Sequence, residues 1–327
     1  MMSGITVILP VYECYSEVRE ILDAVVNETD GSEGIEVIGL AFDDRGAACL
    51  EDVHKDFPNL IAKSYGTFVG LGRAKNDAVR LSKRPFLLFL YPGLRPQPGA
   101  VRRLASVLAN DTSLAAVVGR WRNAQGIIEK GYNLRRFPTA RALAFDALLI
   151  NKLAPKNRAT VHYKMHDFGH DRRTLVEHGN DCVFMLRRSA FDAVGGFSEE
   201  YLPGWFDQVE FCLALKRRGY GVAYVPEAEF IANSNPPLIN RLVEHYYVEF
   251  YKSEYQYARR HFSRIAVAGL RIAVIVGMVQ RLVFLYLPFQ LRIVLLKHFR
   301  SYVSDAYIIS LREKYWRVLQ VFSATGR

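Results

Sequence analysis

The chain has 327 residues, half of them apolar, and a formal net charge of +10. This length and composition allow a full hydrophobic core in one large domain, or in one domain with an appendage, and they exclude a disordered chain. The four cysteines stand far apart without a Cys-x-x-Cys pair, so we expect buried reduced thiols rather than disulfides or zinc ligands. The first apolar run, "ITVILP", is too short for a signal peptide, and we expect a strand there.

The positive charge is concentrated near the C-terminus. Residues 241–327 hold 14 Lys and Arg against 5 Asp and Glu, whereas residues 1–240 hold 29 against 28. A basic segment of this kind favours either nucleic acid or an anionic membrane surface as a partner. The apolar residues around the charges decide between the two, as described below.

The first half of the chain alternates short apolar runs with amphipathic helical patterns, which is typical of an α/β layer around a mostly parallel sheet. A helical pattern follows Ser16, and another follows the glycines at 66, 70 and 72. Residues 121–180 are polar and predict long loops and short helices. A helix is expected near 205–218. The expected strands are 5–10, 35–42, 59–65, 85–90, 115–120, 182–188 and 221–226.

After Pro237 the chain reads as long helices. Arg271, Arg281 and Arg292 interrupt the apolar residues, so no window reaches the roughly 18 uninterrupted apolar residues of a spanning helix. We therefore expect helices that lie in the plane of a membrane interface, with a spanning segment or a soluble dimerisation helix as alternatives. Nucleic acid is not expected as a partner, because phosphate-tracking surfaces lack a wide apolar stripe beside their basic residues.

Ligands of open α/β sheets bind beyond the carboxyl ends of the strands. Four stretches meet this condition: "PVYE", "DDRG", the glycine turn before Arg73, and "YPGLRP". The first strand is not followed by Gly-x-Gly-x-x-Gly, which disfavours a dinucleotide-dependent oxidoreductase.

Several stretches together resemble the family-two glycosyltransferases of the GT-A fold, within their rhamnosyltransferase-like branch. The carriers are "ITVILPVYE", "GLGRAKNDAV", "FLLFLYPGLRPQPGAV", "RRSAFDAVGGFSEEYLPGWFDQVEFCLALKRRGYGVAYVPEAEF" and "YYVEFYKSEYQYARRHF". The resemblance implies a Rossmann-like, mostly parallel sheet flanked by helices. We expect a GT-A glycosyltransferase domain at 1–236 and an amphipathic, membrane-associating helical region at 237–327.

The resemblance also implies which residues surround a nucleoside diphosphate sugar. Asp43 and Asp44 fall about two residues later than the family's acidic position after the second strand, so either a nucleotide role or a plain turn-forming role fits them. The implied nucleotide-sugar residues are Pro10, Tyr12, Glu13, Asp43, Asp44, Arg73, Asn76 and Arg95.

The family's acidic turn after the fourth strand, which binds a divalent cation, is altered here. It reads Tyr91-Pro92-Gly93, and neither tyrosine nor glycine supplies a carboxylate. A Mg or Mn ion therefore remains a possible cofactor, but its usual ligand is missing at Gly93, and we assign no metal-binding residue. Arg73 and Arg95 either neutralise the departing diphosphate instead or are solvated surface residues.

The family's catalytic base is a carboxylate in a Glu-Asp-x-Asp stretch, which takes the proton of the acceptor hydroxyl. In the corresponding "GWFDQVEFC", Gln208 occupies that position, and an amide does not accept the proton usefully. Asp207 is the first candidate for the base and Glu210 the second. The alternative is that both are ordinary acids stabilised by a helix N-terminus.

Two further residues are candidates for the acceptor side. Asp181 stands where the family has a glycine, and offers either a displaced carboxylate or a loop cap. Trp205 precedes the acidic helix, where it either stacks on an acceptor sugar or belongs to the core.

These features predict an inverting glycosyltransferase that moves rhamnose or another hexose from a nucleoside diphosphate sugar to a lipid-linked glycan in bacterial surface polysaccharide synthesis. We expect a cytoplasmic protein held peripherally on the inner face of the cell membrane, with an anionic membrane surface as a partner. The alternative is a catalytically silent, glycosyltransferase-like protein that docks on the membrane as a binding partner.

Overall fold

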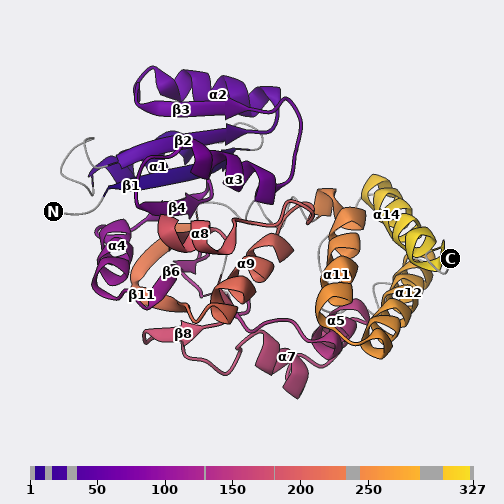
Figure 1. The fold of residues 1–327 in the computed structure, drawn as a ribbon. Helices are drawn as coiled ribbons and strands as arrows, with labels where there is room; N and C mark the ends of the chain where they lie inside the picture. The colour runs from indigo at the N-terminus through magenta and orange to yellow at the C-terminus, as the bar shows by residue number, and fades with distance from the viewer. Residues whose placement is uncertain are drawn as a thin grey trace. The chain divides into compact units, whose positions relative to one another are not determined.

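A computed structural model of the chain describes residues 4–11, 17–27, 35–128, 130–179, 181–232, 244–287 and 305–324. The chain forms two compact units (Figure 1). The first comprises residues 1–137 and 164–246, and the second comprises residues 138–163 and 247–327. Residues 138–163 thus group with the C-terminal helices, and the expected domain boundary at 236 stays a prediction.

The first unit is built on one large mixed sheet with the strand order β3-β2-β1-β4-β10-β6-β11-β5, with β8 also paired to β11. Strands β1 to β4 run parallel, whereas β10 enters antiparallel between β4 and β6. The strands are β1 (Ile5–Val11), β2 (Ile35–Ala41), β3 (Leu60–Ser64), β4 (Phe86–Leu90), β5 (Leu94–Pro96), β6 (Leu114–Arg122), β8 (Thr174–Val176), β10 (Val183–Arg187) and β11 (Gly221–Ala232). A small separate sheet pairs β7 (Leu134–Arg135) with β9 (His178–Gly179).

Helices flank this sheet and bury their apolar faces on it. Helix α2 packs on β2 and β3, α3 on β1 and β2, and α4 on β6, β10 and β11. The helices of this unit are α1 (Glu17–Asn27), α2 (Asp44–His54), α3 (Leu71–Leu81), α4 (Ala100–Asn110), α8 (Arg188–Val194) and α9 (Phe206–Arg217). Strands β1 and β4 are buried along their whole length, as expected for central strands of apolar and β-branched residues.

The second unit is helical: α5 (Ala140–Ala147), α6 (Ile150–Leu153), α7 (Arg158–Tyr163), α11 (Tyr247–His261), α12 (Arg264–Tyr286) and α14 (Asp305–Ala324). Helix α12 packs against α5, α11 and α14, and α12 and α14 lie side by side (Figure 1). Leu270, Val274 and Met278 of α12 belong to a core of their own. Within the described part of the chain, α12 is the one helix long and apolar enough to cross a membrane, and 39% of its most apolar window is buried in the protein.

The predicted fold class is confirmed: a mostly parallel sheet flanked by helices, followed by C-terminal helices. Membrane association stays a prediction. The cysteines at 49, 182 and 212 are buried free thiols, as expected, and Cys14 lies outside the described residues.

Candidate active site

A buried cluster of charged residues lies at the carboxyl end of β4. The Lys75 ammonium donates to Asp181 Oδ1 at 2.6 Å and to Asp207 Oδ2 at 3.1 Å. The Tyr91 hydroxyl donates to Asp181 Oδ2 at 2.5 Å. None of the three charged side chains is more than 3% exposed. The cluster therefore joins four segments, with one cation between two carboxylates.

The strand register explains why Tyr91 and Asp181 meet. Strand β10 runs antiparallel to β4 and pairs Val183 with Leu90, so the residues that follow β4 lie opposite those that precede β10. The Tyr91 amide accordingly donates to the Cys182 carbonyl at 3.0 Å. Asp207 comes from the first turn of α9, where the helix dipole favours a carboxylate.

Burial and the attraction between opposite charges act against each other on the pKa of each residue in the cluster. Burial alone lowers the pKa of Lys75, but the charges of Asp181 and Asp207 outweigh it and raise that pKa above its ordinary value. Burial raises the pKa of Asp181 to about 6, although the Lys75 ammonium opposes this shift. Lys75 is therefore charged at neutral pH and holds the two carboxylates together.

Asp207 retains one oxygen for another partner. Its Oδ2 is held by Lys75, but its Oδ1 is buried and accepts no hydrogen bond from the described residues. A buried carboxylate oxygen without a donor is costly, and such oxygens occur at reactive sites. The side chain is fully buried, so an acceptor hydroxyl reaches Oδ1 only when the surrounding side chains move.

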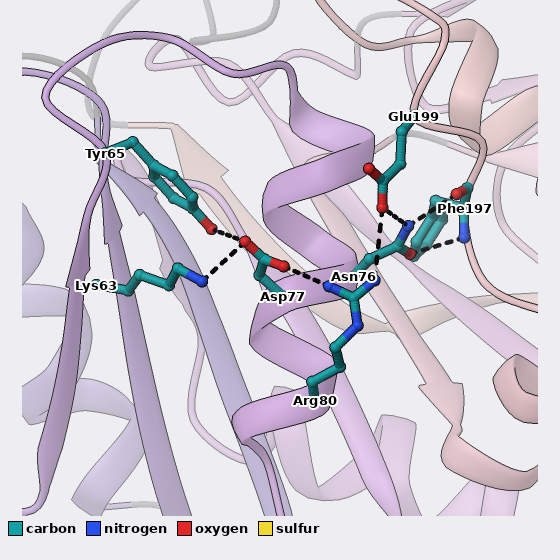
Figure 2. A network of polar contacts seen from close by, with 7 residues as sticks. All are labelled: Lys63, Tyr65, Asn76, Asp77, Arg80, Phe197 and Glu199. Carbon is teal, nitrogen blue, oxygen red and sulfur yellow. Dashed lines mark hydrogen bonds and ion pairs between the residues drawn. The ribbon is translucent and has the colours of Figure 1, made fainter.

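Helix α3, which carries Lys75, is anchored by its next residue, Asn76. The Asn76 amide nitrogen donates to the Phe197 carbonyl and to Glu199, both at 2.9 Å, and its oxygen accepts from the Phe197 amide (Figure 2). Asn76 is buried, so its amide is fully used in joining α3 to the segment before α9. The side chain of Asn76, which the sequence predicts at the nucleotide, is thus hydrogen-bonded within the protein.

A second set of contacts fixes the outer side of α3. Asp77 accepts from Lys63 at 2.8 Å and from the Tyr65 hydroxyl at 3.0 Å, and it pairs with Arg80 (Figure 2). Arg80 in turn lies 3.6 Å from Glu199. Together with Asn76, these contacts tie α3 to β3 and to the segment before α9.

The glycine at position 72 allows this close packing. A side chain at Gly72 would bring its Cβ within 2.3 Å of the Ser198 carbonyl oxygen, which is far inside the contact distance. Only glycine therefore lets α3 approach the segment that leads into α9, and this approach brings Lys75 within reach of Asp207.

The predicted nucleotide residues near β1 and β2 are placed as follows. Pro10 is buried within β1 and pairs with Leu40 of β2. Tyr12 and Glu13 lie outside the described residues. Asp43 caps helix α2, because its Oδ1 accepts from the Gly46 amide at 2.6 Å. This cap is the turn-forming alternative considered for Asp43.

The remaining predicted residues on the nucleotide side are exposed. Asp44 lies in the first turn of α2 with its side chain exposed. Arg73 is exposed on the first turn of α3, and Arg95 is exposed on β5, so both guanidinium groups are accessible to an anionic ligand.

Glu210 and Trp205 lie at either side of the start of α9. Glu210 accepts from the Tyr201 hydroxyl at 3.0 Å. Trp205 is half-buried with a φ of 71°, a strained value for a residue other than glycine, and such strain is found preferentially at functional sites. The Arg135 guanidinium lies 4.3 Å from the Trp205 ring, so an acceptor sugar has only the other face for stacking.

The residues at the turn after β4 do not fit a divalent cation. Tyr91 directs its hydroxyl to Asp181, Gly93 has no side chain, and the two nearby carboxylates already share the Lys75 ammonium. Among the described residues, no group of three or more His, Cys, Asp and Glu side chains is arranged to hold a metal ion. A cation at these two carboxylates would have to displace a buried ammonium, which is unfavourable.

Lys75 was not among the residues predicted from the sequence, and neither was a role for the Tyr91 hydroxyl. The signal for Lys75 lay in the helical spacing: Leu71, Ala74, Ala78 and Val79 form the buried face of α3, and Lys75 falls within that face. A lysine on an apolar helix face requires a buried partner. Asp207 and Asp181 were found as separate candidates, and the structure brings them to one cation.

The chain is similar to known proteins both in sequence and in fold. The chain is 26% identical over 172 residues, 51% of its own length, to the N-acetylglucosaminyl-diphospho-decaprenol L-rhamnosyltransferases of two Mycobacterium tuberculosis strains. The match covers 54% of those relatives, so the chain spans about half the length of the curated relatives it matches. No family model matches the sequence.

A solved structure agrees over a larger part of the chain. The mannosyltransferase PcManGT from Pyrobaculum calidifontis, in complex with GDP-Man and Mn²⁺, covers 100% of this chain with a TM-score of 0.53 at 12% identity, and the match includes 89% of that protein. At this identity the likeness shows the fold alone. The chain therefore shares the fold of a glycosyltransferase and is similar in sequence, over about half its length, to rhamnosyltransferases, which agrees with the resemblance that the sequence motifs indicated.

Proposed function

We propose that this protein transfers rhamnose or another hexose, with inversion, from a nucleoside diphosphate sugar to a lipid-linked glycan acceptor in bacterial surface polysaccharide synthesis. The sugar class and acceptor follow the rhamnosyltransferases to which the chain is similar, and the nucleotide sugar follows the ligand bound to the solved mannosyltransferase. The proposed location is peripheral on the inner face of the cell membrane, facing the cytoplasm, where such an acceptor is accessible.

The observation that carries this proposal is the free oxygen of Asp207. This carboxylate lies at the carboxyl side of the sheet, where α/β folds bind their ligands, and Lys75 keeps a positive charge beside it. A base in an apolar setting needs such a counter-charge to remain ionised. Lys75 is accordingly proposed as a positioning residue and Asp207 as the base.

The proposed reaction is a single displacement. Oδ1 of Asp207 takes the proton of the acceptor hydroxyl while the acceptor oxygen forms a bond to the anomeric carbon. The bond from that carbon to the diphosphate oxygen breaks, and the nucleoside diphosphate leaves with the electron pair. The exposed Arg73 and Arg95 are proposed to neutralise the departing diphosphate, and the exposed Asp44 is proposed to contact the nucleoside.

The test compares Asp207→Asn with Glu210→Gln on nucleotide sugars and a membrane lipid extract. Because Asp207→Asn leaves the Lys75–Asp181 pair intact, we expect it to fold and to lower kcat by at least about a hundredfold, the usual contribution of a general base. Glu210 is engaged by Tyr201, so its variant is expected to keep most of the activity. Equal rates for Asp207→Asn and the unaltered protein would exclude Asp207 as the base.

A second function is favoured by one observation. Asp207 is fully buried, and the turn after β4 carries no carboxylate, as expected of a catalytically silent relative that binds partners at the membrane. Nucleotide binding detected by calorimetry, together with no sugar transfer under any donor and acceptor combination, would support this alternative over the enzyme.

A further inference from the structure

A groove lined by basic and apolar side chains opens on the helical unit. It consists of two adjoining hollows, of about 590 and 790 Å³, that share Tyr255 and Arg259. We call it the basic groove. Its cationic lining residues are Lys252, Arg259, Arg260, Arg264 and Arg271, and no described residue that lines it is acidic.

The other walls of the basic groove are apolar. Phe262, Val267, Ile272 and Ile275 line the larger hollow, and Phe322 lines the smaller one. Several guanidinium groups beside aromatic and aliphatic side chains suit a ligand that has an anionic head and an apolar body. A fully hydrated anion would leave the apolar walls exposed to water.

An exposed apolar stripe on α12 continues from this groove. Its spacing of three, four and seven residues puts these side chains on one helix face, and each is more than 40% exposed. Ile272 belongs both to the stripe and to the groove wall. We call it the α12 stripe: Ile265, Ile272, Val276, Val279, Val283 and Tyr286.

The arginines that interrupt the apolar sequence of α12 turn away from this stripe. Arg271 donates to the carbonyls of Phe322 at 2.7 Å and Ser323 at 3.3 Å at the end of α14. Arg281 donates to the carbonyls of Ala147 and Gly277, at 2.5 and 2.8 Å. The exposed face of α12 between Arg264 and Tyr286 therefore carries no charged side chain.

We infer that the basic groove and the α12 stripe form one docking surface for an anionic phospholipid bilayer, in which the groove binds lipid phosphate and the stripe enters the acyl boundary. Helix α12 packs one side on protein and exposes an apolar side, with the arginines of the groove beside it. Such a helix fits an orientation parallel to the membrane, at the boundary between lipid head groups and acyl chains. A second copy fits less well, because two-fold pairing of this face would bring the like charges of two basic grooves together.

This inference rests on the proposed function, since a lipid-linked acceptor requires the enzyme to meet the bilayer, but its test requires no sugar transfer. The full-length protein is sedimented with phosphatidylcholine vesicles that contain about 30% phosphatidylglycerol or none. We expect strong binding to the anionic vesicles, weakened by salt, and weak binding to the neutral ones.

Two variants locate the surface. Arg259→Gln combined with Arg264→Gln is expected to weaken binding to anionic vesicles about thirtyfold, since each basic residue near such a surface contributes about a fivefold factor. The matched control, Lys314→Gln with Arg317→Gln, removes the same charge from α14 outside the groove and is expected to change binding less than threefold. Ile272→Ser tests the stripe and is expected to weaken binding several-fold.

Several results would overturn the inference. Equal binding of the groove variant and its control would remove the groove from the interface, as would equal binding to anionic and neutral vesicles. A concentration-dependent dimer in sedimentation velocity that Ile272→Ser abolishes would assign the stripe to a second copy. A rise in Tm with inorganic phosphate that the groove variant loses, without any vesicle binding, would assign the groove to a free anion. Vesicle binding without transfer activity would refute the proposed function alone.

Discussion

Lys75 is the residue on which the charge balance of the candidate site depends. Its ammonium is the cation that contacts both Asp181 and Asp207, and all three side chains are excluded from water. Removal of one partner from a buried ion pair leaves an uncompensated charge, which costs far more than the loss of a surface pair.

We predict that Lys75→Met lowers the free energy of unfolding by about 3–5 kcal/mol. The matched control is Lys63→Met. It removes the partly exposed ion pair between Lys63 on β3 and Asp77 on α3, the helix that also carries Lys75, and is expected to cost about 1 kcal/mol or less. Urea unfolding at neutral pH measures both. Similar losses for the two variants would show that the Lys75 cluster is not the stronger constraint on α3.

Single residues also show what the sequence revealed of the cluster. Asp181 was a candidate because it departs from the family pattern, and Asp207 because it flanks the departure at Gln208; both carboxylates contact Lys75, and their roles in catalysis stay predictions. Asn76 was expected at the nucleotide, and its side-chain amide donates to the Phe197 carbonyl and to Glu199. Both partners lie more than 120 positions further along the chain, so no local sequence pattern reveals these contacts. Lys75 was identifiable only from its place on a buried helix face.

At the scale of elements, a carboxyl group is buried where α11 packs near α5 and α12. Glu254 of α11 is 5% exposed, and its Oε1 accepts no hydrogen bond from the described residues. Burial raises the pKa of Glu254 to about 8, Asp146 on α5 adds to the rise, and Arg281 on α12 opposes it. Tyr251, on the same helix, is buried nearby and is also coupled to Glu254 by charge.

A carboxyl group whose pKa is higher in the folded state binds more protons there than in the unfolded chain. Its contribution to stability is therefore complete below the ordinary pKa of a glutamate, and is lost as the pH rises through about 8. Ionisation of Glu254 thus destabilises the helical unit at neutral and alkaline pH.

We predict that Glu254→Gln, which mimics the protonated form, stabilises the protein by about 1–3 kcal/mol at pH 9 and by much less at pH 5. Glu249→Gln on the same helix is the control, because Glu249 is only partly buried and lies 3.9 Å from Lys252. Thermal unfolding at the two pH values measures the difference. A pH-independent effect of Glu254→Gln would contradict the assigned burial of the charge.

The elements themselves were largely predictable from periodicity. The predicted strands at 5–10, 35–42, 59–65 and 85–90 correspond to β1 to β4, and the buried strands β1, β2 and β4 read as nearly continuous apolar runs. Helix α4 was not predicted, nor was the antiparallel insertion of β10 between β4 and β6. That insertion depends on long-range pairing, and it is what brings Asp181 to Tyr91.

At the scale of the whole molecule, the question is which charges balance a nucleoside diphosphate. The turn after β4 offers no carboxylate for a bridging cation, and the nearest acids, Asp181 and Asp207, already share the Lys75 ammonium. Residues 1–240 are nearly neutral overall, so compensation has to come from particular exposed residues rather than from a general positive field. Arg73 and Arg95 are the exposed cations that the predicted nucleotide side offers.

We predict that a chelator changes the rate of sugar transfer less than about twofold, because in the proposed mechanism guanidinium groups of the protein take the role of a cation. Arg73→Gln and Arg95→Gln should each raise KM for the nucleotide sugar about tenfold, the usual loss for a hydrogen bond to a charged group. Arg80→Gln, on the outer side of α3, is the control and should leave KM unchanged, since Arg80 pairs with Asp77 and Glu199. Loss of transfer on chelation, restored by added Mn²⁺, would show that a cation is held by groups other than those at the turn after β4.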